Sequence, residues 1–134
     1  MNIKYFLDFL PSNFRHEKYF IQKNQFDYER LSKLNDFEIN IIQKDFPLCT
    51  LNNLKKLRAI SIFIRDISIS PSEAYLLLHC GVHSIDSLSR LTPYELEQKI
   101  KRLERNLRVK IETKITLSIL KKWIHKANEK IECN

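Results

Sequence analysis

The residues best suited to chemistry lie close together in the run His79-Cys80-Gly81-Val82-His83. Two imidazoles and a thiolate are ligands that zinc prefers, and a fourth ligand would complete a tetrahedral site. No fourth ligand is spaced nearby, and Gly81 is suited to ending a helix, so the two histidines need not share a face. We therefore predict no metal and no cofactor here, with Cys80 packed in the interior and the histidines at the surface.

Signatures of the common enzyme classes are absent from the sequence. It has no Gly-rich nucleotide loop, no nucleophile elbow and no metalloprotease motif. With one glycine among 134 residues, loops that bring backbone amides close to a phosphate are scarce. The sequence predicts a binding module rather than an enzyme, with no small-molecule substrate.

Positive charge is concentrated in the last quarter of the chain. Residues 1–97 hold 12 Lys and Arg against 12 Asp and Glu, whereas residues 98–134 hold 11 against 4, which accounts for the formal net charge of +7. Clustered cations can bind a DNA or RNA backbone without reading its sequence, although a Lys-rich composition also produces ordinary solvated helix faces. The candidate nucleic-acid-binding residues are Lys99, Lys101, Arg102, Arg105, Arg108, Lys110, Lys114, Lys121, Lys122 and Lys126.

The elements that position these residues are predicted to be helices. Asn35, Ser70 and Thr92 are each followed three residues later by Glu, which is the spacing of a capping box at a helix start. Apolar stripes at helical spacing predict a core that includes Ile41 and Trp123. Residues 108–116 alternate in polarity and are either an extended connector or a weak strand. The predicted helices are 3–10, 13–24, 27–33, 36–46, 51–65, 71–80, 85–90, 93–106 and 117–131.

Two stretches of the chain can be aligned with each other. Residues 34–38 match residues 69–73, and residues 46–54 match residues 80–88, so that each unit reads helix, tight turn, short helix. The sequence thus predicts an all-α fold, in a single helical domain over residues 1–134. Its parts are an N-terminal helical segment (1–33), tandem repeats (34–92) and basic C-terminal helices (93–134).

Residues 34–88 resemble a tandem helix-hairpin-helix arrangement. Residues 69–128 resemble a bacterial family of unknown function that is related to helix-hairpin-helix proteins and has cyanobacterial members. The runs 74–88 (Ala-Tyr-Leu-Leu-Leu-His-Cys-Gly-Val-His-Ser-Ile-Asp-Ser-Leu), 92–96 (Thr-Pro-Tyr-Glu-Leu) and 120–127 (Leu-Lys-Lys-Trp-Ile-His-Lys-Ala) carry this second resemblance. It implies the fold, and it implies no assigned activity.

The resemblance also implies where a phosphate would bind. Helix-hairpin-helix motifs hold the nucleic-acid backbone at a Gly-hydrophobic-Gly hairpin, where backbone amides approach the phosphate. The equivalent hairpin positions here are Lys33-Leu34-Asn35 and Ser68-Ile69-Ser70, which contain no glycine. We therefore expect nucleic-acid contact through the basic tail. The alternative is a protein–protein interaction adaptor that keeps the fold. Aromatic residues between positions 5 and 28 would supply its surface, although packing in the core is the use that we expect of them first.

The cysteines and the N-terminal residues favour a cytoplasmic protein. Cys49, Cys80 and Cys133 are odd in number and widely spaced, which is typical of reduced thiols. Residues 1–10 contain charges and run into Pro11, so we expect no signal peptide, and no apolar run approaches membrane-spanning length.

Overall fold

The fold is built from short helices whose starts are set by local capping signals. The computed structural model describes residues 10–107 and 115–133, which form a short 3-10 turn, eight α-helices and no strand. The predicted all-α class is confirmed. The elements are η1 (Ser12–Phe14), α2 (Arg15–Asn24), α3 (Tyr28–Ser32), α4 (Asp36–Asp45), α5 (Leu51–Ile67), α6 (Pro71–His79), α7 (Ile85–Ser89), α8 (Pro93–Leu107) and α9 (Leu117–Glu132).

The predicted helices agree with these bounds to within two residues wherever the structure describes them. The predicted helix over residues 3–10 lies, except for Leu10, outside the described residues. So does most of the connector at 108–116, of which only residues 115 and 116 are described, in no helix. Among the described residues, none of the helices combines the length and hydrophobicity needed to cross a bilayer.

Reciprocal capping boxes begin α4, α6 and α8, as the spacing predicts. At α4 the Glu38 amide donates to the Asn35 side chain at 2.8 Å, and the Asn35 amide donates to the Glu38 carboxylate at 3.1 Å. The Ser70–Glu73 and Thr92–Glu95 pairs repeat this exchange. Each box satisfies two amides that the first turn of a helix otherwise leaves without a partner.

Gly81 ends α6 in a left-handed conformation. Its φ of 90° is rarely adopted by residues with a Cβ. The glycine is required for this angle rather than for space, since a Cβ at this position would meet no described atom within 4 Å beyond its chain neighbours. The Gly81 amide donates to the Leu78 carbonyl at 3.0 Å, and the Val82 amide donates to the Leu77 carbonyl at 2.9 Å. This Schellman arrangement turns the chain so that Val82 is fully buried.

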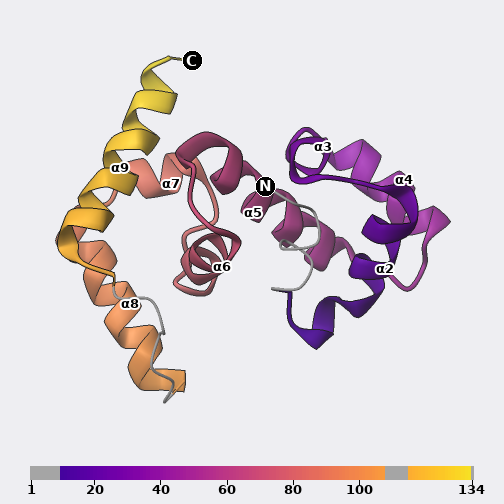
Figure 1. Cartoon of the computed structure of the whole chain (residues 1–134), viewed down its shortest axis with the longest axis horizontal. Coiled ribbons are helices and arrows are strands. Elements are labelled where there is room, and N and C mark those ends of the chain that lie inside the picture. Colours follow the sequence, from indigo (N-terminus) through magenta and orange to yellow (C-terminus); the bar gives the residue numbers. More distant parts are fainter. Residues whose placement is uncertain (1–9, 108–114, 134) are drawn as a thin grey trace.

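Helix α5 is the centre of the molecule. It packs against α3, α4, α6, α7 and α9, and residues such as Leu57, Ile60 and Phe63 are fully buried. Figure 1 shows α2, α3 and α4 at one end of the molecule and α8 and α9 at the other, with α5 and α6 between them. The buried residues form one cluster that runs from Leu10 to Ala127 and includes the predicted Trp123.

One prediction about the apolar core is wrong. The sequence predicts Ile41 in the core, but its side chain is 42% exposed, and Ile39 is fully buried instead. The two positions lie about 160° apart on a helix, so only one of them can face α5. Of the aromatic residues between positions 5 and 28, Phe14 and Phe20 are buried, in agreement with the core packing expected for them. Phe26 and Tyr28 are half-buried, Tyr19 is exposed, and Tyr5, Phe6 and Phe9 lie outside the described residues.

A buried carboxylate fixes α2 to the start of α5. Glu17 is almost completely buried, and it accepts hydrogen bonds from the Thr50 amide at 3.2 Å and from the Asn53 side chain at 2.9 Å. Thr50 is the N-cap of α5, where the unpaired amides carry partial positive charge that favours an anion. Sequence reasoning missed this residue because its partners lie more than thirty residues away.

Candidate nucleic-acid interface

Helix α8 separates its apolar and its charged side chains onto opposite faces. Leu96 and Ile100 are buried, and Leu103 is half-buried. The opposite side of the helix begins at Tyr94 and includes the residues four, seven, eight and eleven positions after it. The α8 basic face consists of Tyr94, Gln98, Lys101, Arg102 and Arg105.

The cations of the α8 basic face are available to a ligand. Arg102 and Arg105 are exposed, and neither has an ion-pair partner among the described residues. The Lys101 ammonium is exposed and lies 3.5 Å from the carboxylate of the half-buried Glu97, an i,i+4 pair of the kind that contributes only a few tenths of a kcal/mol. Tyr94 is 67% exposed on the same face, two to three turns before the cations.

The lysines of α9 divide into free and engaged groups. Lys121 and Lys122 are exposed on the outer side of the helix. Lys126 is half-buried and donates to the carbonyl of Ile67, the last residue of α5, at 3.3 Å. A cation at this position satisfies a carbonyl that the helix leaves unpaired. Lys126 thus takes part in holding α9 against α5.

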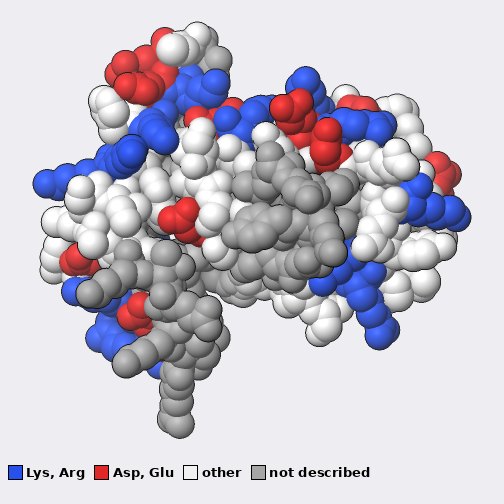
Figure 2. All heavy atoms as spheres, in the orientation of Figure 1, with Lys and Arg blue, Asp and Glu red and all other residues white. Residues whose placement is uncertain are grey.

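Four predicted tail residues remain, of which the structure describes only Lys99. Lys99 is half-buried and near Cys80. Burial raises the pKa of the Cys80 thiol to about 11, although the positive charge of Lys99 acts to lower it. Arg108, Lys110 and Lys114 lie outside the described residues. Figure 2 shows Lys and Arg side chains over both ends of the visible face, with Asp and Glu among them. Among the described residues of this side, basic and acidic side chains are therefore interspersed.

The hairpins use their amides internally. The Ser70 amide donates to Glu73, Pro71 has no amide hydrogen, and the Asn35 amide donates to Glu38. In the first hairpin, Arg58 donates to the Leu34 carbonyl at 3.2 Å. The capping boxes thus occupy the amide of the third hairpin residue, which a phosphate would otherwise approach.

The two hairpins differ at their first residue. Ser68 has a φ of 55°, in the left-handed region that favours glycine, whereas Lys33 has a φ of −93°. The middle residue Ile69 is 5% exposed, and Leu34 is half-buried. The predicted hairpin residues therefore form two turns of unlike geometry.

The run around Gly81 forms no cluster of ligands. The His79 ring packs edge-on against Tyr75 with centroids 4.2 Å apart, and burial together with the nearby Lys56 ammonium lowers the pKa of His79. Among residues 10–107 and 115–133, no three His, Cys, Asp or Glu side chains gather as a metal-binding group. Cys49 is buried and Cys80 half-buried, and burial raises the pKa of the Cys49 thiol to about 11, with Glu17 adding to the effect.

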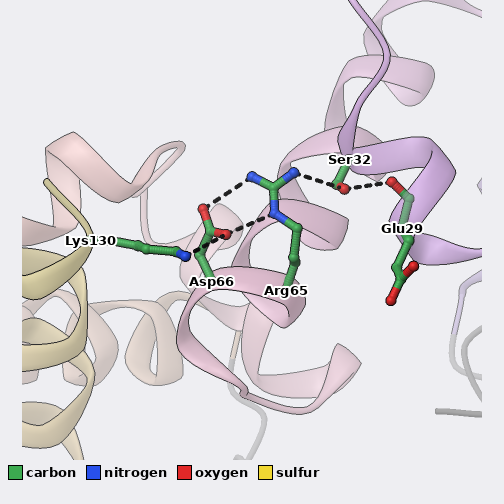
Figure 3. A network of polar contacts seen from close by, with 5 residues as sticks. All are labelled: Glu29, Ser32, Arg65, Asp66 and Lys130. Atoms are coloured by element: carbon green, nitrogen blue, oxygen red, sulfur yellow. Dashed lines mark hydrogen bonds and ion pairs between the residues drawn. The ribbon is translucent and has the colours of Figure 1, made fainter. Parts of the chain in front are cut away.

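A network of polar contacts joins α3, α5 and α9, and sequence reasoning did not identify it (Figure 3). Arg65 donates to both carboxylate oxygens of Asp66, at 2.7 and 3.2 Å, and to the Ser32 hydroxyl at 3.0 Å. Ser32 in turn donates to the Glu29 carbonyl at 2.7 Å, and the Lys130 ammonium lies 4.0 Å from Asp66. Three residues of the network, Ser32, Asp66 and Lys130, line a cleft of about 790 Å³ beside α5.

Comparison with known proteins places the chain in a family. Residues 26–130 match the family described as "Domain of unknown function (DUF4332)". The chain belongs to this family. The DUF4332 match extends from just before α3 into α9, so it includes both hairpins and the α8 basic face. No curated protein matched the chain, and no solved structure matched it.

Proposed function

We propose that this DUF4332 chain is a non-enzymatic binding module of the helix-hairpin-helix type that binds the nucleic-acid backbone without reading its sequence. The observation that carries the proposal is the α8 basic face, where Lys101, Arg102 and Arg105 are exposed on the same face as Tyr94. Cations on one face neutralise successive phosphates, and an exposed aromatic ring can stack on a base. Lys121 and Lys122 on α9 are further exposed cations.

The relation to tandem helix-hairpin-helix proteins is part of the proposal. Helices α4 and α6 both begin with a capping box, and five residues separate each from the next helix. Thr50 and Ser84 occupy equivalent positions, and each accepts a hydrogen bond as the N-cap of that next helix. These matched signals support two copies of one unit, although α5 is much longer than α7.

The test replaces the three cations of the α8 basic face together. Lys101→Glu, Arg102→Glu and Arg105→Glu should weaken binding to a labelled single strand or duplex by more than about tenfold at low salt. Each lost contact to a duplex also lowers the slope of log affinity against log salt by about 0.9 unit. Fluorescence anisotropy across a salt series measures both effects.

The matched control places the same change of charge elsewhere. Arg15, Lys23 and Lys44 are exposed on α2 and α4, and their replacement by Glu gives the same net charge as the α8 variant. The control should retain most of the affinity, and circular dichroism should show that both variants keep their helices. Equal losses in the two variants, or no binding of DNA or RNA by the wild-type chain at low salt, would refute the proposal.

A second candidate function is a protein-interaction adaptor, and α4 provides its surface. Phe37 is 71% exposed and Ile41 is 42% exposed, one turn apart on the side of α4 opposite Ile39. Binding through such a face survives nuclease treatment and high salt, because apolar burial is not screened. A partner whose retention resists both treatments and is lost on Phe37→Asp would favour this function.

A further inference from the structure

The cleft on α5 combines an apolar floor with cations at its edge. Ala59, Ile62 and Phe63 of α5 and Ile85 of α7 supply apolar lining. Lys55 and Lys56, near the start of α5, are among the polar lining residues. A volume of about 790 Å³ is within the range of sites for small molecules and short peptide segments.

The uncompensated charge of the cleft is positive. The two acidic residues of its described lining are both paired, since Asp66 binds Arg65 and lies near Lys130, and Asp86 lies 3.2 Å from Arg90. Lys55 and Lys56 have no ion-pair partner in the part of the chain that the structure describes. An occupant with negative charge would therefore find cations that no residue of the described chain already neutralises.

The walls of the cleft are held at a fixed spacing. The Arg65–Ser32 hydrogen bond connects α5 to α3, and the Lys126–Ile67 hydrogen bond connects α9 to α5 (Figure 3 shows the first). On the α3 side, Arg58 bridges the Leu34 carbonyl and the Asp36 carboxylate, the latter at 2.9 Å. A site that is already formed requires little ordering when a ligand binds.

We propose that this cleft binds a short acidic, amphipathic peptide segment of a partner protein. An apolar side chain of the segment packs on Ile62 and Ile85, and its carboxylates contact Lys55 and Lys56. A nucleic-acid strand fits less well, because its sugars and phosphates offer no apolar side chain to pack on Ile62 and Ile85. In addition, Phe63 is the only Phe, Tyr or Trp among the described lining residues and is fully buried, so a base has no ring of this kind to stack on there.

The test uses defined peptides and the whole chain. The probe is a fluorescein-labelled peptide of about twelve Glu and Leu residues arranged as an amphipathic helix, which follows the helix-in-groove mode of recognition. A Glu and Ala peptide removes the apolar anchors, and a Lys and Leu peptide inverts the charge. The wild-type chain should bind the first peptide at least about tenfold more tightly than either of the others.

The variants exploit two pairs of adjacent lysines. Lys55→Glu with Lys56→Glu should weaken binding of the Glu and Leu peptide by about tenfold, because two cations that attract the peptide become anions that repel it. Lys121→Glu with Lys122→Glu makes the same change on the outer side of α9 and should alter the affinity by less than about twofold. Ile62→Ser should also weaken binding, and melting curves identify any variant that fails to fold.

Four outcomes would overturn the proposal. The first is that the wild-type chain does not bind the Glu and Leu peptide, and the second is that it binds the Glu and Ala peptide equally well. The third is that the two lysine-pair variants lose the same amount of affinity. The fourth is that a short single strand of nucleic acid competes with the peptide, and that this competition disappears in the Lys55→Glu, Lys56→Glu variant. The last would assign the cleft to nucleic acid. The α8 triple variant should keep its peptide affinity, so this test is independent of the proposed function.

Discussion

The hairpins before α4 and α6 end in the same kind of capping box. They differ in the backbone conformation of their first residue and in the burial of their middle residue. Asn35 and Ser70 exchange hydrogen bonds with Glu38 and Glu73 in the same way. Ser68, however, is left-handed and leads to the buried Ile69, whereas the chain before Asn35 stays right-handed at Lys33. The cap thus determines where a helix starts, and the contacts of the middle residue determine the direction from which the chain arrives.

The largest difference in stability between the hairpins should appear when the middle hairpin residue, Ile69 or Leu34, is replaced. Ile69→Ala removes a side chain that is only 5% exposed and should lower the free energy of unfolding by about 2–4 kcal/mol. Leu34→Ala removes a half-buried side chain at the edge of the cleft and should cost about half as much. Urea denaturation of the two variants measures the difference, and equal losses would show that the hairpins are equivalent in packing.

The capping residues should show no such difference. Ser70→Ala and Asn35→Ala each remove one side-chain acceptor for an amide, and each should cost about 1 kcal/mol. The same denaturation measurement applies, with Ser84→Ala as a further capping variant at α7. A loss at one hairpin more than about twice that at the other would mean that the boxes are not energetically alike.

The smallest expected change in stability is at the first hairpin residue, where substitution by glycine should have opposite signs in the two hairpins. Ser68→Gly relieves a left-handed backbone and should stabilise the fold by about 0.5–1 kcal/mol, after the greater freedom of glycine in the unfolded chain is taken into account. Lys33→Gly relieves nothing, and it should destabilise the fold by a similar amount. Thermal melting of both variants is the check, and a destabilising Ser68→Gly would contradict the conformation assigned to Ser68.

What the sequence predicts well is local. The capping boxes at Asn35, Ser70 and Thr92 depend on residues three positions apart, and the Gly81 turn depends on its own backbone, so spacing alone identifies them. The buried Glu17 depends on distant residues of α5 and its cap, which only the folded chain brings near. Periodicity could not separate Ile39 from Ile41, because both are isoleucines and the contact with α5 decides which is buried.

In the candidate sites, too, features that depend on neighbouring residues could be predicted from the sequence, and contacts between distant residues could not. The outward position of Lys101, Arg102 and Arg105 could be predicted from helical spacing on α8. The engagement of Lys126 with Ile67 could not, because its acceptor is 59 residues away. The cleft was missed for the same reason, because its lining residues come from helices that are far apart in the sequence.

Helix α8 packs chiefly on α9, whereas α9 also packs on α5 and α7. A helix held through one neighbour can detach at a fraction of the free energy needed to open the centre of the molecule. The α8 basic face therefore lies on a unit that can exchange with solvent by partial unfolding while the core around α5 remains closed. An anion bound across Lys101, Arg102 and Arg105 would shift that local equilibrium toward the docked helix, which couples ligand binding to the order of the C-terminal part of the chain.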